Sequence, residues 1–472
     1  MRVNAENCTK KALIAHLFRR AGFGITFDEL ADYLPIDYGD IVEQLLYPEL
    51  QPELDQDVVR RYNIDQNSLM LIESSQANWM YRIINTKRPL EEKMALFWHD
   101  LFATAYSKLN HAKAVVNQTD TFRRCGLGNF RTLLLELSRD PAMIFWLDNK
   151  DNHKGSPNEN YGRELLELFS LGIGNYSEED VKACAKAFSG WTIANSVYMS
   201  ERASRDSIWP HGRLDWQFVY MPEDHDDSDK TFLGQTGRFN GDDVIDIIVD
   251  NPATSWFIAS KLYSFFVSDK PDESVIQYLS QEFSKTGGDI RKVMRSLFLS
   301  ETFLSDKARL ARVKSPAELV AGTAKLAGSH SFPDWTTVNL AMDANFMGQE
   351  ILNPPTVEGW HTGTEWIDTG NLVERINSAA LEIGDIQHPG VKSIINKVCA
   401  HGGVCTAQDL VDLSLDSMCQ FEISDSTRNS LLKYADMKGP LYFDRQDQIA
   451  CSEQRVGEML QLIVSTREYQ LA

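Results

Sequence analysis

The residues whose types and spacing could do chemistry are densest between positions 148 and 172, where a polar turn leads into a helical pattern. They carry carboxylate, amide or guanidinium groups, in the turn or on one face of the helix: Asp148, Asn149, Asn158, Asn160, Arg163, Glu164 and Glu167. The helical members form one stripe, because residues three, four and seven positions apart share a side of a helix. Carboxylate and amide oxygens from a loop and a helix are what Ca²⁺ or Mg²⁺ prefers. The alternative is a solvated helix face with an Arg163–Glu167 ion pair.

A second motif combines a histidine with carboxylates. Asp224-His225-Asp226-Asp227 is followed closely by Lys230. An imidazole beside a carboxylate can bind a transition metal or act as a general base, since the carboxylate stabilises the protonated ring. The alternative is a polar surface turn.

Two further segments could hold a substrate. Arg19 and Arg20 lie at the end of a helical segment that glycines terminate, and adjacent guanidinium groups can hold an anion through paired hydrogen bonds. Pairing with the protein's own carboxylates is the alternative that we favour. A turn stiffened by Pro354 and Pro355 presents Trp360 to a ligand, although core packing of this ring is the favoured alternative.

Together these motifs predict a divalent-metal-dependent enzyme of the hydrolase type that acts on an anionic or sugar-like substrate. The expected metal ligands are Asp148, Asn160, Glu164 and His225. The expected catalytic residues are Glu164, His225 and Asp226. The residues expected to bind substrate are Arg19, Arg20, Asn149, Asn158, Arg163, Lys230 and Trp360. Because oxygen donors dominate the set, Ca²⁺ or Mg²⁺ is expected before Zn²⁺.

The composition limits the partners that the chain can have. The 472 residues carry a formal net charge of −20. This charge argues against nucleic acid or an anionic membrane surface, because binding to either needs clustered Lys and Arg. No apolar stretch reaches the roughly 18 residues that a membrane-spanning helix needs. Residues 1–20 lack the apolar core of a signal peptide, so the sequence taken alone predicts a cytoplasmic protein.

The seven cysteines match no zinc-binding pattern. Buried free thiols are expected for Cys8, Cys125 and Cys184. The other four are closer together, and one or two disulfides could form among them if the protein is exported: Cys399, Cys405, Cys419 and Cys451.

The elements that position these residues are predicted to be helices of ordinary length joined by short loops. Capping boxes open three of them, at Thr26–Glu29, Ser156–Glu159 and Ser315–Glu318, and we expect Ser156 to cap a helix that starts at Pro157. In such a box the first side chain accepts from a backbone amide three residues later, and the Glu reaches back to the cap.

One segment departs from this pattern. Residues 191–241 are rich in aromatic residues, Ser, Asp and Gly, and we predict a long irregular insertion with a short β-hairpin formed by 191–193 and 216–220. The fold class is therefore mainly α. We expect a main helical domain over 1–383 and a C-terminal helical region over 384–472, packed on the main domain.

Several segments resemble, in order, the signature blocks of a bacterial family called domain of unknown function 1800. They read HLFRRAGFG, EKMALFWHDLFAT, GNFRTLLLELSRDPAMIFWLDN, KGSPNENYGRELLELFSLG, YSEEDVKACAKAFSGW, HDDSDKTFLGQTG, KSPAELV and NPPTVEGW. The resemblance spans nearly the whole chain and weakens after about Gly384.

The resemblance implies a partner. Members of this family are typically encoded beside a protein of the family called domain of unknown function 1501, which resembles the alkaline phosphatase and sulfatase group. An alternative function is therefore that of a non-catalytic partner or maturation factor for this companion, with export to the periplasm or cell surface alongside it. A second alternative is a glycan- or ligand-binding protein that uses Trp191, Trp216 and Trp360.

Overall fold

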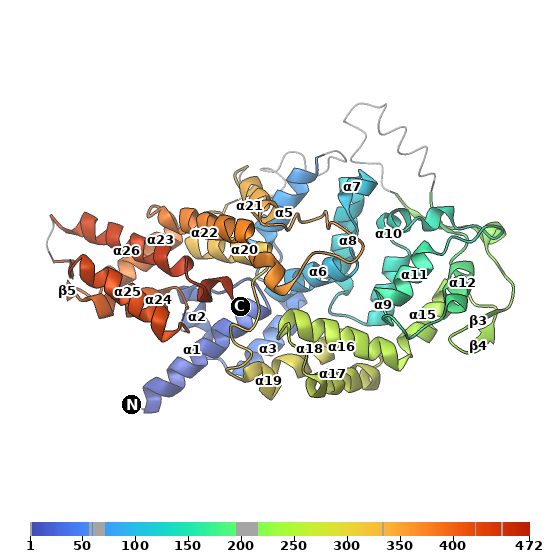
Figure 1. Ribbon diagram of the computed structural model, residues 1–472, viewed down its shortest axis with the longest axis horizontal. Coiled ribbons are helices and arrows are strands. Elements are labelled where there is room, and N and C mark those ends of the chain that lie inside the picture. The colour runs from blue at the N-terminus through green and yellow to red at the C-terminus, as the bar shows by residue number, and fades with distance from the viewer. Residues whose placement is uncertain are drawn as a thin grey trace.

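Figure 1 shows the computed structural model, which describes residues 2–55, 59, 71–194, 216–332, 335–420, 422–444 and 447–472. Up to residue 151 the helices are α1 (Arg2–Arg20), α2 (Phe27–Tyr33), α3 (Tyr38–Leu46), η1 (Pro48–Leu50), α5 (Ile72–Asn85), α6 (Pro89–Leu101), α7 (Tyr106–Leu109), α8 (Ala112–Cys125), α9 (Phe130–Ser138), α10 (Pro141–Trp146) and η2 (Asn149–Asp151). The middle of the chain holds α11 (Asn160–Glu167), α12 (Glu178–Ala187), η3 (Pro222–Asp224), α15 (Gly241–Val249), α16 (Pro252–Phe266), α17 (Glu273–Thr286), α18 (Ile290–Phe298), α19 (Glu301–Leu304), α20 (Pro316–Ala327) and α21 (Thr337–Phe346).

The C-terminal part is also helical. It comprises η4 (Gly363–Ile367), α22 (Thr369–Gly384), α23 (Pro389–Cys399), α24 (Ala407–Ser417), α25 (Asp425–Met437), α26 (Ile449–Val464) and η5 (Glu468–Gln470). These helices occupy one end of the elongated molecule, and α9 to α12 occupy the other, with α5, α6 and α20 between them (Figure 1). The C-terminal helices lie against the main body, because α22 packs on both α20 and α26 and α23 packs on α20.

The strands are few and short, which confirms a mainly α fold. β1 (Trp191–Ile193) pairs antiparallel with β2 (Phe218–Tyr220), so the predicted hairpin is present. Residues 195–215 of the predicted insertion lie outside the described residues. Two further antiparallel pairs were not predicted: β3 (Lys230–Phe232) with β4 (Gln235–Gly237), and β5 (Val404–Cys405) with β6 (Leu441–Tyr442).

Local capping explains where several helices begin. The capping boxes predicted at Thr26–Glu29 and Ser315–Glu318 are both formed. The one predicted at Ser156 is wrong, because the backbone of Ser156 pairs instead with His153 and the helix begins only at Asn160. The N-cap residue of α11 is Glu159, which makes no side-chain capping bond, and the Asn158 side-chain oxygen accepts from the Asn160 backbone amide at 3.0 Å.

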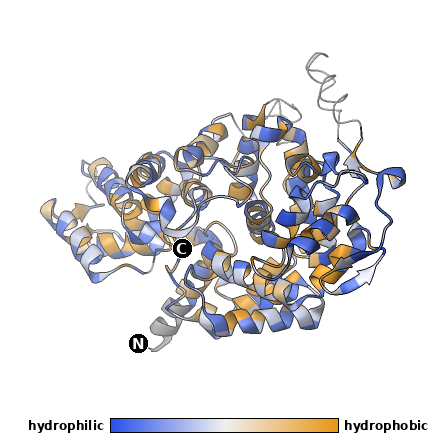
Figure 2. Ribbon diagram, turned by 45° about the vertical axis from the view of Figure 1, so that its right-hand side comes forward, coloured by the Kyte–Doolittle hydropathy of each residue, from blue (hydrophilic) through white to orange (hydrophobic). Residues whose placement is uncertain are grey.

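The helices bury one continuous apolar core. Apolar residues lie mainly on the sides of helices that face other helices, and polar residues on their outer sides (Figure 2). The hydrophobic effect therefore fixes how the helices pack, as expected for amphipathic helices. Among the described helices, none combines the length and the apolar character that crossing a bilayer requires.

Six cysteines are free thiols: Cys125, Cys184, Cys399, Cys405, Cys419 and Cys451. Cys125 is only partly buried, so its predicted burial is wrong, and the side chain of Cys8 lies outside what the structure describes. Burial raises the pKa of Cys419 to about 12 and that of Cys399 to about 11, so both are protonated at neutral pH. Cys184 is fully buried in the core, as predicted.

Candidate functional site

The structure brings together part of the predicted metal site. Asp148 has a left-handed backbone (φ 57°) that turns the chain into η2. The side-chain amide of Asn158 donates to the backbone carbonyl oxygen of Asp148 at 3.3 Å. The side-chain amide of Asn160 lies 3.5 Å from the Asp148 carboxylate. The Lys108 ammonium, from α7, is 3.0 Å from both carboxylate oxygens. A lysine therefore already neutralises the charge of Asp148.

Asn149 has a structural role in this turn. It is buried, and its amide donates to the carbonyl oxygens of Phe188 at 3.3 Å and Trp191 at 2.8 Å. It therefore ties the end of α12 and the start of β1 to the turn. This position gives it no exposed group for a substrate.

The stripe on α11 is partly as predicted, but the predicted Arg163–Glu167 ion pair is wrong. Arg163 reaches Glu178 on α12 at 2.7 Å, because α12 packs alongside, and Glu167 accepts from the Tyr176 hydroxyl at 2.5 Å. Glu164 is partly buried. Its pKa is raised by burial and by its carboxylate neighbours, Glu167 first.

The histidine motif forms a surface turn with a buried centre, because Asp227 is exposed whereas His225 and Asp226 are buried. His225 and Asp226 are 4% and 9% exposed. The His225 ring nitrogen Nδ1 lies 2.9 Å from the Ser189 carbonyl oxygen, and the Asp226 amide donates to the Ser189 hydroxyl at 2.8 Å. Lys230 is buried too, and its ammonium donates to the carbonyl oxygens of Asp226 and Ser228. The motif thus fastens the end of α12.

Trp360 packs in the core, as favoured from the sequence. It is 5% exposed, and its ring meets His99 edge-on with centroids 5.2 Å apart. Its backbone amide donates to the Asp100 carboxylate at 2.9 Å. Burial lowers the pKa of His99 to about 3, so this ring is neutral.

The predicted site residues therefore fall into separate groups. Asp148, Asn158 and Asn160 lie together. The histidine motif adjoins this turn, since Asp224 accepts from the Lys154 backbone amide at 3.2 Å, whereas Arg19 and Arg20 lie at the end of α1. That end of α1 lies near the middle of the molecule, and α11 and α12 lie at one end of it (Figure 1). Within the described residues, no three His, Cys, Asp or Glu side chains are arranged to hold a metal ion. The divalent cation and the hydrolase activity stay predictions.

A cation at Asp148 would have to displace Lys108. We therefore expect Ca²⁺ or Mg²⁺ to raise the thermal unfolding midpoint more in Lys108→Met than in the wild-type chain, because the variant removes the competing charge. Differential scanning fluorimetry measures this. Lys392→Met, which removes an exposed lysine, is the matched control. An unchanged midpoint in all three proteins would remove the reason to place a cation there.

A different group of charges lies at the end of α1. Arg20 is 1% exposed, and one of its terminal nitrogens donates to the carbonyl oxygens of Val267 and Ala308, each at 2.9 Å. Arg19 donates to the Cys419 carbonyl oxygen at 3.3 Å. The hydrogen bonds of both guanidinium groups thus go to backbone oxygens. Among the described residues, neither group donates a hydrogen bond to one of the protein's own carboxylates, which is the pairing that the sequence favoured. Carboxylates nevertheless stabilise both charges, Glu422 that of Arg19 and Glu318 that of Arg20.

Further cations surround the same place. We call the whole set the cationic cluster: Arg19, Arg20, Lys93, Arg312, Lys314 and Arg375. Its one internal carboxylate is Glu318, which accepts from the Lys93 ammonium and lies 4.0 Å from Arg312. Burial would raise the pKa of Glu318, but Lys93 and Arg312 lower it to about 2. Glu318 is therefore ionised and neutralises part of the cluster.

The other cations hydrogen-bond mainly to neutral groups, with Asp269 and Glu422 as nearby carboxylates. Lys314 donates to the Tyr469 carbonyl oxygen at 2.6 Å, and Arg375 donates to the Gln470 side chain at 2.9 Å. Arg312 also lies 3.7 Å from Asp269, at the edge of the cluster. Burial and the neighbouring cations lower the pKa of Lys93 to about 8, although Glu318 opposes this shift. Burial is the largest cause of the lowered pKa of Lys93, Lys314 and Arg375.

Several guanidinium nitrogens in the cluster have no acceptor among the described residues. They are Arg19 Nε, Arg20 Nε, Arg20 Nη1, Arg312 Nε and Arg375 Nη1. A buried donor without an acceptor costs about 1–3 kcal/mol, and more when it is charged. Native proteins leave few such groups without a partner, so water or an anion is expected as the acceptor at these positions. Of these four arginines, Arg19 is the one that lines the cavity beside the cluster.

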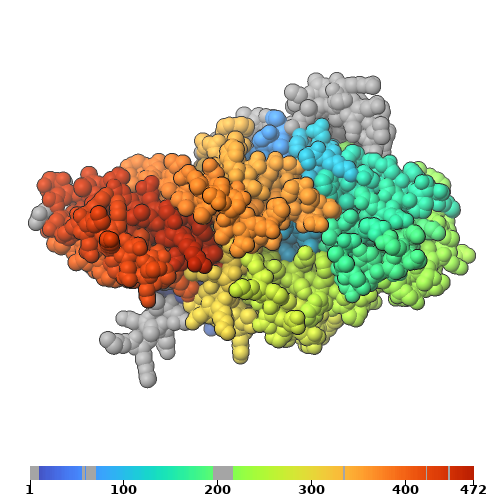
Figure 3. All heavy atoms as spheres, in the orientation of Figure 1, coloured from blue at the N-terminus to red at the C-terminus, as the bar shows by residue number. Residues whose placement is uncertain are grey.

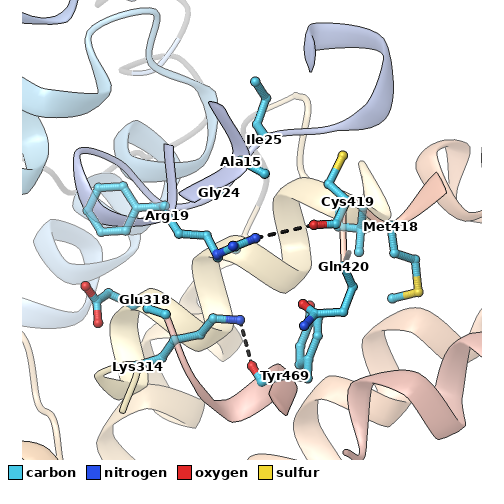
Figure 4. A pocket seen from close by; sticks show the side chains of 14 residues that line it. Ala15, Arg19, Gly24, Ile25, Lys314, Glu318, Met418, Cys419, Gln420 and Tyr469 are labelled. Atoms are coloured by element: carbon cyan, nitrogen blue, oxygen red, sulfur yellow. Dashed lines mark hydrogen bonds between the residues drawn. The ribbon is translucent and has the colours of Figure 1, made fainter. Parts of the chain in front are cut away.

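A cavity of about 50 Å³ lies beside the cluster. Arg19 and Lys314 both line it, together with Phe23, Gln420 and Tyr469. Figure 4 shows the Arg19 guanidinium and the Lys314 ammonium pointing toward the same space near Gln420, while the Glu318 carboxylate points away. The lining comes from α1, from α20 and the segment before it, and from the C-terminal part of the chain. Figure 3 shows C-terminal residues, in red, next to orange and yellow residues near the middle of the molecule.

Of this cluster, the sequence analysis identified only Arg19 and Arg20 as candidates. Lys93 and Arg375 were missed because each is an isolated cation in its own segment. Arg312 and Lys314 were missed because they stand in a short basic stretch, KARLARVK, in which the sequence does not show which side chains are buried. A signal was available at Lys93, which occupies a core-facing position between apolar residues of α6. Lysine is almost never fully buried unless it is paired, so such a position suggests a buried charge.

Comparison with known protein families gives one match that spans nearly the whole chain. A family model described as "Protein of unknown function (DUF1800)" matches residues 16–471. No curated protein and no solved structure matches the chain. The match covers every member of the cationic cluster.

Proposed function

Because the chain belongs to the DUF1800 family, whose function is unknown, its own geometry must indicate its function, and we propose that it binds a small oxyanion, or the anionic group of a larger ligand, between Arg19 and Lys314. The observation that carries this proposal is the pair of cations, Arg19 and Lys314, that line one cavity within a buried cluster of six cations. The Arg19 Nε atom is buried and has no acceptor among the described residues. Guanidinium groups bind carboxylates, phosphates and sulfates through paired, charge-assisted hydrogen bonds.

The balance of charge supports an anionic ligand. Buried charges that lack a partner are strongly unfavourable, and the attraction between opposite charges is larger inside a protein than in water. An anion between Arg19 and Lys314 would accept hydrogen bonds from both and reduce the repulsion between them. The cavity volume of about 50 Å³ suits a group of a few heavy atoms.

The sequence hypothesis also expected an anionic ligand, but beside a metal site. The present proposal assigns the anionic ligand to the cationic cluster instead. The companion-protein hypothesis stays a prediction. Co-expression with a companion protein and pull-down tests it separately, because it does not depend on the cluster.

Thermal unfolding in sulfate tests the proposal. Sulfate at low millimolar concentration, with ionic strength held constant by chloride, should raise the unfolding midpoint of the wild-type chain, since a ligand that binds only the folded state stabilises it by mass action. Lys314→Met should have a higher midpoint than the wild type without sulfate, because it removes a charge from a cluster of like charges. The same variant should lose most of the increase caused by sulfate.

Lys392→Met is the control for the loss of one positive charge from the surface. It should respond to sulfate as the wild type does, and this response includes the general stabilisation by sulfate of any folded protein. Arg19→Leu should lose the specific increase, as Lys314→Met does. Equal responses of all four proteins to sulfate would contradict the proposal.

A further inference from the structure

The cavity contains an amine in an unusual setting. Lys314 enters it from the segment before α20, and its Nζ atom donates to the Tyr469 carbonyl oxygen at 2.6 Å. Nζ also lies over the Tyr469 ring, 4.1 Å from its centroid. Much of the remaining wall is apolar: Ala15, Phe23, Ile25, Leu326 and Met418. The ammonium thus has few partners that favour its charged form.

The charges that face Lys314 are mostly positive. Burial, then Arg19 from α1 and Arg375 from α22, lower the pKa of Lys314 to about 7, with Lys93 from α6 adding to the shift and Glu318 opposing it. Near neutral pH, much of this side chain is therefore a neutral amine with a lone pair. The Tyr469 oxygen accepts one N–H, which leaves that lone pair available. A lysine in an apolar pocket beside another cation is an established form of activated nucleophile.

We propose that Lys314 is a nucleophile that forms an imine with a small 2-oxo acid whose carboxylate is held by Arg19. This proposal rests on the proposed oxyanion site and names the class of its ligand. In a 2-oxo acid the carbonyl carbon is bonded directly to the carboxylate. Pairing of the carboxylate with Arg19 therefore brings the carbonyl carbon toward Nζ, because both side chains point into the same space (Figure 4).

The bond changes balance without another reactant. The Nζ lone pair attacks the carbonyl carbon, and the electron pair of the C=O π bond moves to the oxygen, which takes one proton from nitrogen. The C–O bond then breaks, the oxygen leaves as water with the second proton from nitrogen, and a C=N bond forms. Glyoxylate and pyruvate match a cavity of about 50 Å³ better than a sugar phosphate does.

Reductive trapping tests this inference on the full chain. Glyoxylate and cyanoborohydride should convert Lys314 to a carboxymethyl derivative at neutral pH, which peptide mapping by mass spectrometry locates. We expect Lys314 to be labelled about ten-fold or more faster than the exposed Lys392, because a neutral amine in an apolar pocket is the better nucleophile. Sulfate should slow the labelling of Lys314 and leave that of Lys392 unchanged.

Two variants separate the imine from the oxyanion site. Lys314→Arg keeps the charge without a nucleophilic amine, so it should keep the sulfate-induced rise in unfolding midpoint and lose the label. Arg19→Leu keeps the Lys314 amine, but Lys314 should no longer be labelled faster than Lys392 in this variant. Labelling spread over exposed lysines, together with a retained sulfate response, would overturn the imine and leave oxyanion binding standing. Labelling of Lys314 that sulfate does not slow would uphold the amine and contradict the oxyanion site.

Discussion

Glu318→Gln should lower the free energy of unfolding by about 3–5 kcal/mol, because it removes the one carboxylate inside a cluster of buried cations. Lys93 loses its ionic partner, and Arg312 loses its nearest carboxylate inside the cluster. The Ser315 backbone amide also exchanges a carboxylate acceptor at 2.6 Å for an amide oxygen. Urea unfolding followed by circular dichroism measures the difference.

The control is Glu374→Gln, which neutralises an exposed carboxylate on the neighbouring helix α22. It should change stability by no more than about 0.5 kcal/mol. Sulfate should restore more stability to Glu318→Gln than to the wild type, since the anion then supplies the missing negative charge. If the two variants were equally stable, Glu318 would not be the group that neutralises the cluster.

The same carboxylate predicts a loss of stability in acid. The pKa of Glu318 is lowered to about 2 in the folded chain, against an ordinary value of 4.5, by Lys93 and Arg312 in spite of burial. Its contribution to stability is therefore present above about pH 4.5 and is lost as the pH falls toward 2. In Glu318→Gln this part of the pH dependence should be absent.

The affinity for sulfate should fall by roughly ten-fold to a hundred-fold between pH 6 and pH 9, because Lys314 loses its proton and a charge-assisted hydrogen bond is worth about 1.5–3 kcal/mol. Sulfate is the suitable probe, since it stays doubly charged over this range. The pKa of Lys314 is about 7, lowered by burial and by Arg19 and Arg375. Isothermal titration calorimetry at several pH values measures the affinity.

Without an anion, the pH dependence of stability should have the opposite sign. The folded chain binds fewer protons at Lys314 than the unfolded chain between about pH 7 and pH 10.5, so raising the pH through this window stabilises it. Lys314→Met should lose both effects, whereas Lys392→Met should keep both. A sulfate affinity that does not change with pH would show that Lys314 does not contribute its charge to the site.

The local parts of the fold could be predicted from the sequence. The capping boxes at Thr26–Glu29 and Ser315–Glu318 involve groups only three residues apart, so a short pattern encodes them completely. The β1–β2 hairpin followed from the aromatic and β-branched residues of its strands. The predicted Ser156 box did not form, because the backbone of Ser156 hydrogen-bonds to the backbone of His153 instead.

The candidate site depended on contacts between distant segments. In the sequence, the 148–172 stretch has the densest polar groups. In the folded chain, Asp148 forms an ion pair with Lys108 and Arg163 forms one with Glu178, so these charges are already neutralised. Arg19 and Arg20 look like one pair of adjacent cations among many. Only packing shows that Lys93, Lys314 and Arg375 join them.

By itself, the sequence determined the fold class, several helix starts and one hairpin, because backbone hydrogen bonding and the burial of apolar faces depend on near neighbours and on regular spacing. Only the tertiary structure decided which charges lack a partner, because that depends on groups hundreds of residues apart. Glu318 illustrates both cases. Its hydrogen bond to Ser315, three residues away, can be predicted from the sequence, whereas its bond to Lys93 joins residues 225 positions apart. The excess of buried positive charge, and with it the proposed oxyanion site, exists only once the chain has folded.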